Sequence, residues 1–266
     1  MEKNIAILGG GNLGAAIAEG LVLAGTSKPN QITITRRNIA KLDQLKRGGF
    51  QVTDDNAFAV KKSHIIILCV QPKQLHNLLV SIQSLLNPEK HILVSTITGV
   101  VTSEIAKMVN PAVPIVRAMP NTAIAIGKSM TCICSTNARP EQIKEIELLF
   151  GSLGKTLEIE ERLMKAATVL AASGIAFFMR YLRAATQGGI QLGFDSEEAQ
   201  LIAVQTALGA ASLILENNSH PELEIDKVTT PEGCTIAGLN EMEHQGLSSA
   251  LIKGIITSYD KINNIR

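Results

Sequence analysis

The first 160 residues alternate between short apolar runs and stretches whose apolar residues recur at helical spacing. The apolar runs predict strands at residues 4–8, 31–35, 64–70, 91–96, 113–117 and 130–134. The helical stretches between them predict helices at residues 12–23, 39–47, 74–86 and 140–150. Residues 64–70 read HIIILCV, a continuous run that is typical of a parallel strand covered on both faces. This order predicts an α/β fold with a doubly wound parallel sheet.

From about residue 160 the pattern indicates helices alone. Helical spacing covers residues 160–171, 173–192, 196–216, 235–245 and 247–263. We therefore predict two domains, residues 1–160 and an all-helical domain at 161–266. The helix at 173–192 is unusually apolar, which indicates that the second domain completes its core against another copy of itself. A homodimer or a larger homo-oligomer is expected.

Composition and charge exclude several classes of protein. The apolar and charged fractions, 45% and 18%, are ordinary for a globular protein, and the net charge is +1 without a basic or acidic block. Neither nucleic acid nor an anionic membrane surface is an expected partner, because both require a concentrated cationic face. The longest apolar stretch in the second half of the chain, residues 166–179, is too short to cross a bilayer. The apolar segments near the N-terminus are interrupted, which does not fit the continuous apolar region of a signal peptide. We expect a cytoplasmic protein.

Cysteine and histidine spacing predicts neither a disulfide framework nor a metal site. The four cysteines lack paired CxxC spacing, and the five histidines are scattered: Cys69, Cys132, Cys134, Cys234, His64, His76, His91, His220 and His244. Reduced cysteines are the simplest expectation.

A glycine-rich motif follows the first predicted strand and opens the first predicted helix. The motif is G-x-G-x-x-G, formed by Gly9, Gly11, Asn12, Leu13 and Gly14 around Gly10. In this position it is typical of a dinucleotide site: Gly9 permits the turn, Gly11 lets the backbone approach the pyrophosphate, and Gly14 lets helix and strand pack closely. Free N–H groups at the helix start would bind the phosphates. Elsewhere in a sequence the same string often marks only a tight turn.

The end of the second predicted strand indicates which dinucleotide binds. An NAD site usually carries an acid there, but this strand ends with Arg36 and Arg37. Paired guanidinium groups would bind a ribose 2′-phosphate through charge-assisted hydrogen bonds. The alternative is two solvated arginines at a helix start, where cations are slightly disfavoured. NADP(H) is the preferred cofactor, with NAD(H) as the alternative.

Polar residues also follow two later apolar runs, at Val70-Gln71-Pro72-Lys73 and at residues 117–122. Both would lie at the carboxyl edge of the sheet, where ligands bind, although each could equally be a plain loop cap. In the helical half, a hydroxyl-rich loop with Thr230, Pro231 and Gly233 leads into a helix near Thr235. Free N–H groups there could bind a small carboxylate. N-capping by Thr230 or Thr235 would explain the same pattern.

Over nearly its whole length the chain resembles the pyrroline-5-carboxylate reductases. The stretch 228–239 looks like that family's signature V-T-S-P-G-G-x-T-I-x-G-L, which is a specific pattern. Further matches are the glycine motif, Val70-Gln71-Pro72, Val94-Ser95, Arg117-Ala118-Met119-Pro120-Asn121-Thr122 and Gln205-Thr206. Two positions depart from the family: Glu232 replaces the first glycine of Pro-Gly-Gly, and Ile175 replaces the proline of S-G-P-A.

The resemblance implies a Rossmann domain followed by a helical domain that interlocks in a dimer, often assembled further into a decamer. It implies NADPH-dependent reduction of 1-pyrroline-5-carboxylate, a cyclic imino acid, to proline. Thr235 would hydrogen-bond the ring nitrogen and act as the catalytic residue. The other implied substrate residues are Met119, Thr230, Gly233 and Cys234. The implied cofactor residues beyond the glycine motif and the two arginines are Val70, Gln71, Pro72 and Asn121.

Two rival functions share this sequence plan. A β-hydroxyacid dehydrogenase needs a base for the alcohol proton, supplied in that family by a lysine after a glycine-rich turn. Here Ser173-Gly174 is followed by Ile175, Ala176 and Phe177, and no lysine follows. The second rival is a non-catalytic protein that senses NADP. Turnover of NADPH with 1-pyrroline-5-carboxylate separates all three functions.

Overall fold

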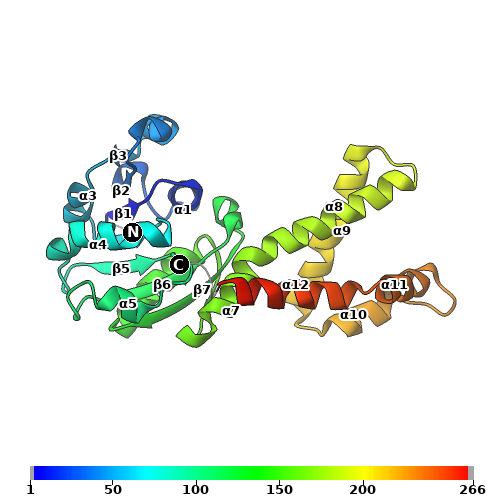
Figure 1. Ribbon diagram of the computed structural model, residues 1–266. Helices are drawn as coiled ribbons and strands as arrows, with labels where there is room; N and C mark the ends of the chain where they lie inside the picture. Colours follow the sequence, from blue (N-terminus) through cyan, green and yellow to red (C-terminus); the bar gives the residue numbers. More distant parts are fainter. Residues whose placement is uncertain (1–2, 263–266) are drawn as a thin grey trace. The chain divides into compact units, whose positions relative to one another are not determined.

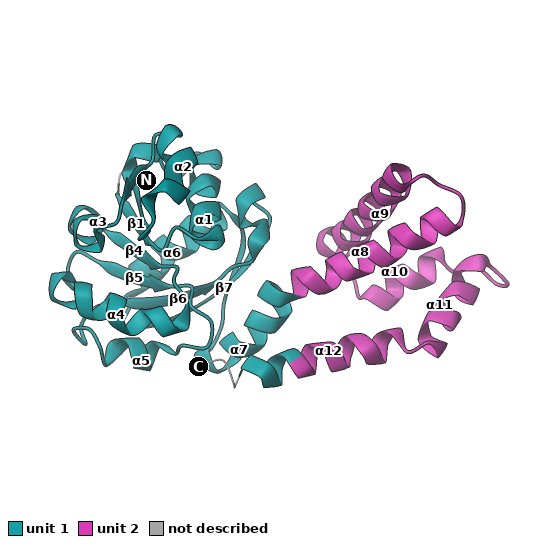
Figure 2. Ribbon diagram, turned by 45° about the horizontal axis from the view of Figure 1, so that its top comes forward, with its two compact units in different colours: residues 1–173, 258–266 teal, residues 174–257 magenta. Residues whose placement is uncertain are grey.

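The computed structural model describes residues 3–262, which form two compact units (Figure 2). Unit 1 comprises the chain up to Ser173 together with the segment from Ser258, and unit 2 is Gly174–Thr257. The chain passes from unit 1 to unit 2 inside one continuous helix, Glu161–Gln191. The domain boundary at residues 160 and 161 stays a prediction.

Unit 1 is built on an eight-stranded sheet with strand order β3-β2-β1-β4-β5-β6-β7-β8 (Figure 1). The strands are β1 Ile5–Leu8, β2 Ile32–Thr35, β3 Gln51–Thr53, β4 Ile65–Leu68, β5 Ile92–Ser95, β6 Ile115–Met119, β7 Ser129–Thr136 and β8 Gly154–Glu158. Neighbouring strands are parallel except β6 and β7, which are antiparallel. The first six strands have the order of a Rossmann fold, so the predicted α/β class is confirmed.

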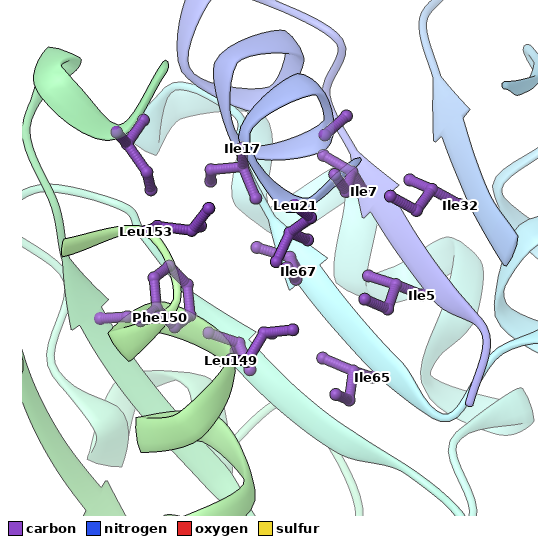
Figure 3. Close-up of a cluster of buried hydrophobic side chains, with 14 of the residues drawn as sticks. Ile5, Ile7, Ile17, Leu21, Ile32, Ile65, Ile67, Leu149, Phe150 and Leu153 are labelled. Atoms are coloured by element: carbon purple, nitrogen blue, oxygen red, sulfur yellow. The ribbon is translucent and has the colours of Figure 1, made fainter. Parts of the chain in front are cut away.

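Helices cover both faces of this sheet, and alternate residues of each strand supply the two cores. Ile5 and Ile7 of β1 pack with α1 (Asn12–Leu23) and α6 (Pro140–Gly151) in a core that includes Phe150 (Figure 3). Ala6 and Leu8 face a second core. That core is completed by α3 Asn56–Lys62, α4 Pro72–Ile82 and α5 Thr102–Ala106. Burial on both faces explains the continuous apolar runs in the sequence.

Short connecting elements account for most of the differences from the prediction in unit 1. The expected helix at 39–47 is a 3₁₀ turn followed by one short α-helix, and β3, α3, α5 and β8 were not predicted. The remaining elements are η1 Pro29–Gln31, η2 Ile39–Leu42, α2 Asp43–Arg47, η3 Gln83–Leu85, η4 Thr122–Ile126, η5 Glu161–Leu163, α7 Met164–Ala167 and the π-helical segment η6 Thr168–Ser173. Helix α4 begins at Pro72, two residues before the predicted start, because a helix tolerates proline in its first turn.

Unit 2 is all-helical, as the sequence predicted. Its helices are α8 Gly174–Gln191, α9 Ser196–Asn217, α10 Pro221–Val228, α11 Cys234–His244 and α12 Leu247–Ile262, of which α12 runs on into unit 1. Helix α10 was not predicted, and position 263 of the last predicted helix lies outside the described residues. The two helices expected at 160–171 and 173–192 are one helix, because the π-helical segment continues directly into α8.

The helices of this half expose large apolar side chains. Phe178 of α8 is 70% exposed, and Leu201 and Leu215 of α9 are 69% and 77% exposed. By length and composition alone, the helices Glu161–Gln191 and Ser196–Asn217 could cross a membrane. The first of them is longer than the apolar stretch 166–179 that the sequence indicated. The same test is passed by core helices of soluble proteins, so it is weak support for a membrane span.

A buried histidine lies at the amino end of β5. His91 is 2% exposed, its Nδ1 accepts a hydrogen bond from the Asn87 N–H at 2.9 Å, and burial with the charges of Lys90 and His64 lowers its pKa to about 4. The unfolded chain therefore binds a proton that the folded chain does not, between pH 6.5 and 4. We expect the free energy of unfolding to fall by about 3 kcal/mol as the pH decreases through that window.

Denaturant titrations at several pH values and one protein concentration measure this dependence. His91→Gln should flatten the slope, whereas the same change at the exposed His76 should leave it as in the wild type. Equal slopes for the wild type and His91→Gln would contradict the assignment.

Candidate functional site

The glycine loop between β1 and α1 contains two positions that no larger residue fits. Gly9 has a φ of +117°, and a Cβ there would lie 2.3 Å from the Cys69 carbonyl oxygen. A Cβ on Gly14 would lie 2.2 Å from the Gly9 carbonyl oxygen and 3.1 Å from Ile7. These glycines hold the loop against β1 and β4, as their predicted roles require.

Gly11 differs from these two because no described heavy atom lies within 4 Å of its Cβ position. It is the N-cap residue of α1, and within residues 3–262 no side chain caps that helix end. No described side chain therefore caps the N–H groups of the first turn, of which Asn12 is exposed and Gly14 is buried. Such a helix start is an anion site, because unpaired N–H groups and the helix dipole both favour negative charge.

A cavity of about 820 Å³ opens over this loop at the carboxyl ends of β1, β2 and β4. Six of the predicted cofactor residues line it: Gly9, Gly11, Arg36, Arg37, Val70 and Gln71. The predicted residues Asn12, Leu13, Gly14, Pro72 and Asn121 are not part of this lining. Gly14 is buried behind the loop, and Pro72 begins α4.

The two arginines at the end of β2 are placed differently. Arg36 is half-buried, and its Nη1 donates a 2.7 Å hydrogen bond to the Gly10 carbonyl oxygen, so its guanidinium is held over the glycine loop. Arg37 is exposed at the cavity wall. Lys41 and Lys73 also line the cavity, with Asp54 as its carboxylate. Four cations against one carboxylate favour a ligand that carries several phosphates.

Further polar residues line this cavity that were not predicted to bind the cofactor: Thr35, Asn38, Lys41, Asp54, Asn56, Lys73, Gln74, Asn77 and Ser81. Asn56 follows β3, and its Oδ1 accepts a 2.6 Å hydrogen bond from the Thr35 hydroxyl. Lys41 could have been found from its position four residues after Arg37. Asp54 and Asn56 could not, since the short strand β3 was not predicted.

Cys69 lies in the cavity wall but is not a nucleophile at neutral pH. Burial raises the pKa of its thiol to about 12, against a smaller opposing effect of the hydrogen bond from Thr96. All four cysteines are free, and residues 3–262 contain no group of three His, Cys, Asp or Glu side chains that could hold a metal ion.

The segment after β6 is held by its own side chains. Asn121 Oδ1 accepts from the Ala123 N–H at 3.0 Å, and its Nδ2 donates to the Ala171 carbonyl oxygen at 3.1 Å. Met119 is 3% exposed, in a small core with Met164 and Ala167. Strand β6 continues through Met119, so Arg117 lies within the strand and not at its end.

In unit 2, the hydroxyl-rich loop forms a tight turn in front of α11. The Gly233 N–H donates to the Thr230 carbonyl oxygen at 3.0 Å, and a Cβ on Gly233 would lie 2.5 Å from the Thr230 hydroxyl. Helix α11 begins at Cys234 with Gly233 as its N-cap, and no described side chain caps it. The hydroxyl groups of Thr230 and Thr235 therefore do not cap α11, which was the alternative explanation for the hydroxyl-rich loop. The free N–H groups at Cys234 and Thr235 can donate hydrogen bonds to a carboxylate.

Glu232 occupies a backbone conformation that favours glycine. Its φ is +59°, in the left-handed region, and its side chain is exposed. The glycine that the family signature carries at this position suits that conformation without strain. The carboxylate extends into solvent in unit 2, and its effect on substrate choice stays a prediction.

Two families of known proteins match separate parts of the chain. Residues 4–99 match the family described as NADP oxidoreductase coenzyme F420-dependent, and residues 161–265 match the family described as pyrroline-5-carboxylate reductase dimerisation. The second match covers the helices that expose large apolar side chains, and it supports a homo-oligomer in which another copy covers them.

Curated relatives and a solved structure agree with these matches. The chain is 51% identical to pyrroline-5-carboxylate reductase 1 of Dictyostelium discoideum over 98% of its length, although it spans only 49% of that relative. It is 48% identical to pyrroline-5-carboxylate reductase 2 of the same organism, covering 98% of this chain and 92% of the relative. The crystal structure of Plasmodium falciparum pyrroline carboxylate reductase with NADP bound has the same fold, with a TM-score of 0.89, 22% identity and coverage of 99% and 98%. This chain belongs to the pyrroline-5-carboxylate reductase family.

Proposed function

We propose that this chain is an oxidoreductase that reduces 1-pyrroline-5-carboxylate to L-proline with NADPH. The observation that carries the proposal is the start of α11, which no side chain of residues 3–262 caps and which lies inside the segment that resembles the family signature. The family assignment supports the same reaction, since the chain spans 92% of a reductase to which it is 48% identical.

The cavity of unit 1 fits a dinucleotide phosphate. Its open glycine loop and free helix start suit a pyrophosphate, and Arg37 with Lys41 suits a 2′-phosphate. The first family match names an NADP oxidoreductase over residues 4–99, and the Plasmodium structure holds NADP. Bound NADPH supplies the hydride. NADH, which lacks the 2′-phosphate, would be the weaker cofactor.

The loop before α11 binds and orients the substrate. The N–H groups of Cys234 and Thr235 and the hydroxyl of Thr230 bind the carboxylate, and the Thr235 hydroxyl orients the ring nitrogen. The N–H of Gly233, which the resemblance also implies, donates to the Thr230 carbonyl oxygen instead and shapes the turn. A cyclic imine accepts hydride best as its protonated iminium, so the chain need not supply a strong acid. Its residues act by positioning the ring and excluding water. Met119 in unit 1 is the further substrate contact that the resemblance implies.

Thr235→Ala tests this role. We expect kcat/KM for 1-pyrroline-5-carboxylate to fall by about tenfold or more, because a hydrogen bond to a charged group contributes roughly 1.5–3 kcal/mol. NADPH oxidation with substrate, in the wild type and the variant, measures the loss. Thr235→Ser keeps the hydroxyl and should retain most of the activity.

Wild-type kinetics in a folded Thr235→Ala variant would remove Thr235 from the mechanism. Binding of NADPH by the wild type without turnover would refute the reductase itself and favour a sensor.

For the assembly, we propose cytoplasmic dimers that associate further into a decamer, as the resemblance implies. The homo-oligomer itself rests on the dimerisation match over residues 161–265. Sedimentation velocity tests the larger assembly, because ten chains of 28.4 kDa sediment far faster than two.

A further inference from the structure

A buried arginine in the middle of β6 has one ionic partner among the residues that the structure describes. Arg117 is 4% exposed, and its Nη1 lies 3.1 Å from Glu161 Oε1. Its Nε has no hydrogen-bond partner among residues 3–262. A buried guanidinium requires a counter-charge, so the position of Glu161 is fixed by a strand that lies 44 residues earlier in the sequence.

The Glu161 carboxylate connects three segments of unit 1. Besides Arg117, it accepts the Thr102 N–H at 2.7 Å and the Thr102 hydroxyl at 2.7 Å. That hydroxyl lies 2.8 Å from the hydroxyl of Thr136, at the end of β7. Burial acts to raise the pKa of Glu161, but the hydrogen bonds from Thr102 and Arg117 outweigh it and hold the pKa below its usual value. The carboxylate is therefore charged at neutral pH.

Glu161 is also the first residue of the helix Glu161–Gln191, which leads from unit 1 into unit 2. The unit 1 part of this helix, residues 161–173, lies on β6 and β7. Met164 and Ala167 pack there against Met119, with Cys132 and Cys134 of β7 completing the small core. At the far end of this part, the Ala171 carbonyl oxygen accepts the hydrogen bond from Asn121.

The root of the helix, defined as residues 161–173, is thus held at both ends with Met119 between them. Arg117 and Met119 lie two residues apart on β6 and so face the same side of the sheet. A shift of the root would move the side chains that pack on Met119. The glycine loop and the arginines that bind phosphate take no part in these contacts.

We propose that Glu161, through Arg117 and Thr102, is a positioning residue that holds the helix root and Met119 for substrate binding. The inference rests on the proposed function and adds to it a residue that touches neither cofactor nor substrate. Its loss should raise KM for the imino acid and leave the affinity for NADPH nearly unchanged, because Glu161 contacts neither the cavity that would hold the phosphates nor Asn121 itself.

The test compares Glu161→Ala and Glu161→Gln with the wild type in the full chain. Four quantities are measured: the dissociation constant for NADPH by nucleotide fluorescence, KM and kcat for 1-pyrroline-5-carboxylate, and the melting temperature. We expect Glu161→Ala to raise KM by about tenfold or more, since small displacements of a binding group are costly. Glu161→Gln should have an intermediate KM, because its amide oxygen can still accept the Thr102 N–H. The dissociation constant for NADPH should stay within about twofold of the wild-type value.

Arg162→Ala is the matched control. Arg162 is the next residue of the same helix start and forms an exposed ion pair with Glu160, 2.6 Å from Arg162 Nε to Glu160 Oε2. Exposed pairs contribute little, so this variant should keep the wild-type KM and melting temperature.

A merely structural role would lower the melting temperature and reduce kcat with the folded fraction, and it would leave KM unchanged. That result overturns the inference, as does a parallel loss of NADPH affinity. Both differ from failure of the proposed function, in which the wild type itself would not turn over the imino acid.

Discussion

Gly11→Ala is expected to weaken NADPH binding by roughly 10–100-fold without lowering the stability of the cofactor-free protein. The Cβ position of Gly11 has no described neighbour within 4 Å, so a methyl group there fits the folded chain. The same methyl group would stand where the backbone must approach the pyrophosphate. Losing one charge-assisted hydrogen bond corresponds to about 1.5–3 kcal/mol, which is that range of affinity.

Gly14→Ala is the informative comparison for this change. Its Cβ would lie 2.2 Å from the Gly9 carbonyl oxygen, so α1 and the loop must move apart. Overpacking of this kind costs about 1–3 kcal/mol, and we expect both the melting temperature and NADPH affinity to fall. Calorimetric titration with NADPH and thermal melts of the cofactor-free variants measure the two effects. A Gly11→Ala variant that binds NADPH as the wild type does would show that the pyrophosphate does not lie on this loop.

Arg37→Ala is expected to lower kcat/KM with NADPH by roughly 10–100-fold while leaving kcat/KM with NADH nearly unchanged. Arg37 is exposed at the wall of the cavity that Lys41 also lines, where a guanidinium can bind the 2′-phosphate that only NADPH carries. Arg36→Ala should lower the NADPH preference too, but it should also weaken NADH, because Arg36 holds the Gly10 carbonyl oxygen of the loop common to both cofactors.

Steady-state kinetics with each cofactor, at one fixed ionic strength, measure these ratios. Lys46→Ala provides a control, since Lys46 is an exposed cation of α2 outside the cavity. If neither arginine variant changes the ratio of NADPH to NADH efficiency, the 2′-phosphate is bound by other residues and the preference needs another explanation.

The cofactor cavity could be largely predicted because its chemistry follows strand ends. The carboxyl ends of parallel neighbours meet at one edge, so Gly9, Arg36 and Gln71 come together although they are far apart in the sequence. Asp54 and Asn56 were missed since β3 has only three residues and lacks an apolar run. Asn121 was predicted to bind cofactor, yet both groups of its side-chain amide are engaged within unit 1. Its contact with NADPH stays a prediction.

The prediction of the fold failed where elements are short or their partners are distant. Helix α5 has five residues and β8 exposes most of its side chains, so neither has a periodic apolar pattern. Strand β7 was predicted, but its antiparallel direction was not. That direction depends on the path of the loop after β6, which no local sequence pattern predicts. The π-helical segment Thr168–Ser173 could not be predicted either, because its pattern of apolar and polar residues does not differ from that of an α-helix.

By itself, the sequence determined the α/β class, the glycine motif with its two arginines, the helical second half and the family resemblance. These depend on local periodicity and on short motifs, which neighbouring residues carry alone. Only the tertiary structure decided that Arg36 bonds the glycine loop and that no described side chain caps the start of α11. It alone placed Glu161 against a buried arginine 44 residues away, because such contacts form only when the sheet brings distant segments together. The glycine loop and the arginines of the cofactor site could thus be predicted from the sequence, whereas the contacts that hold the root of the helix could not.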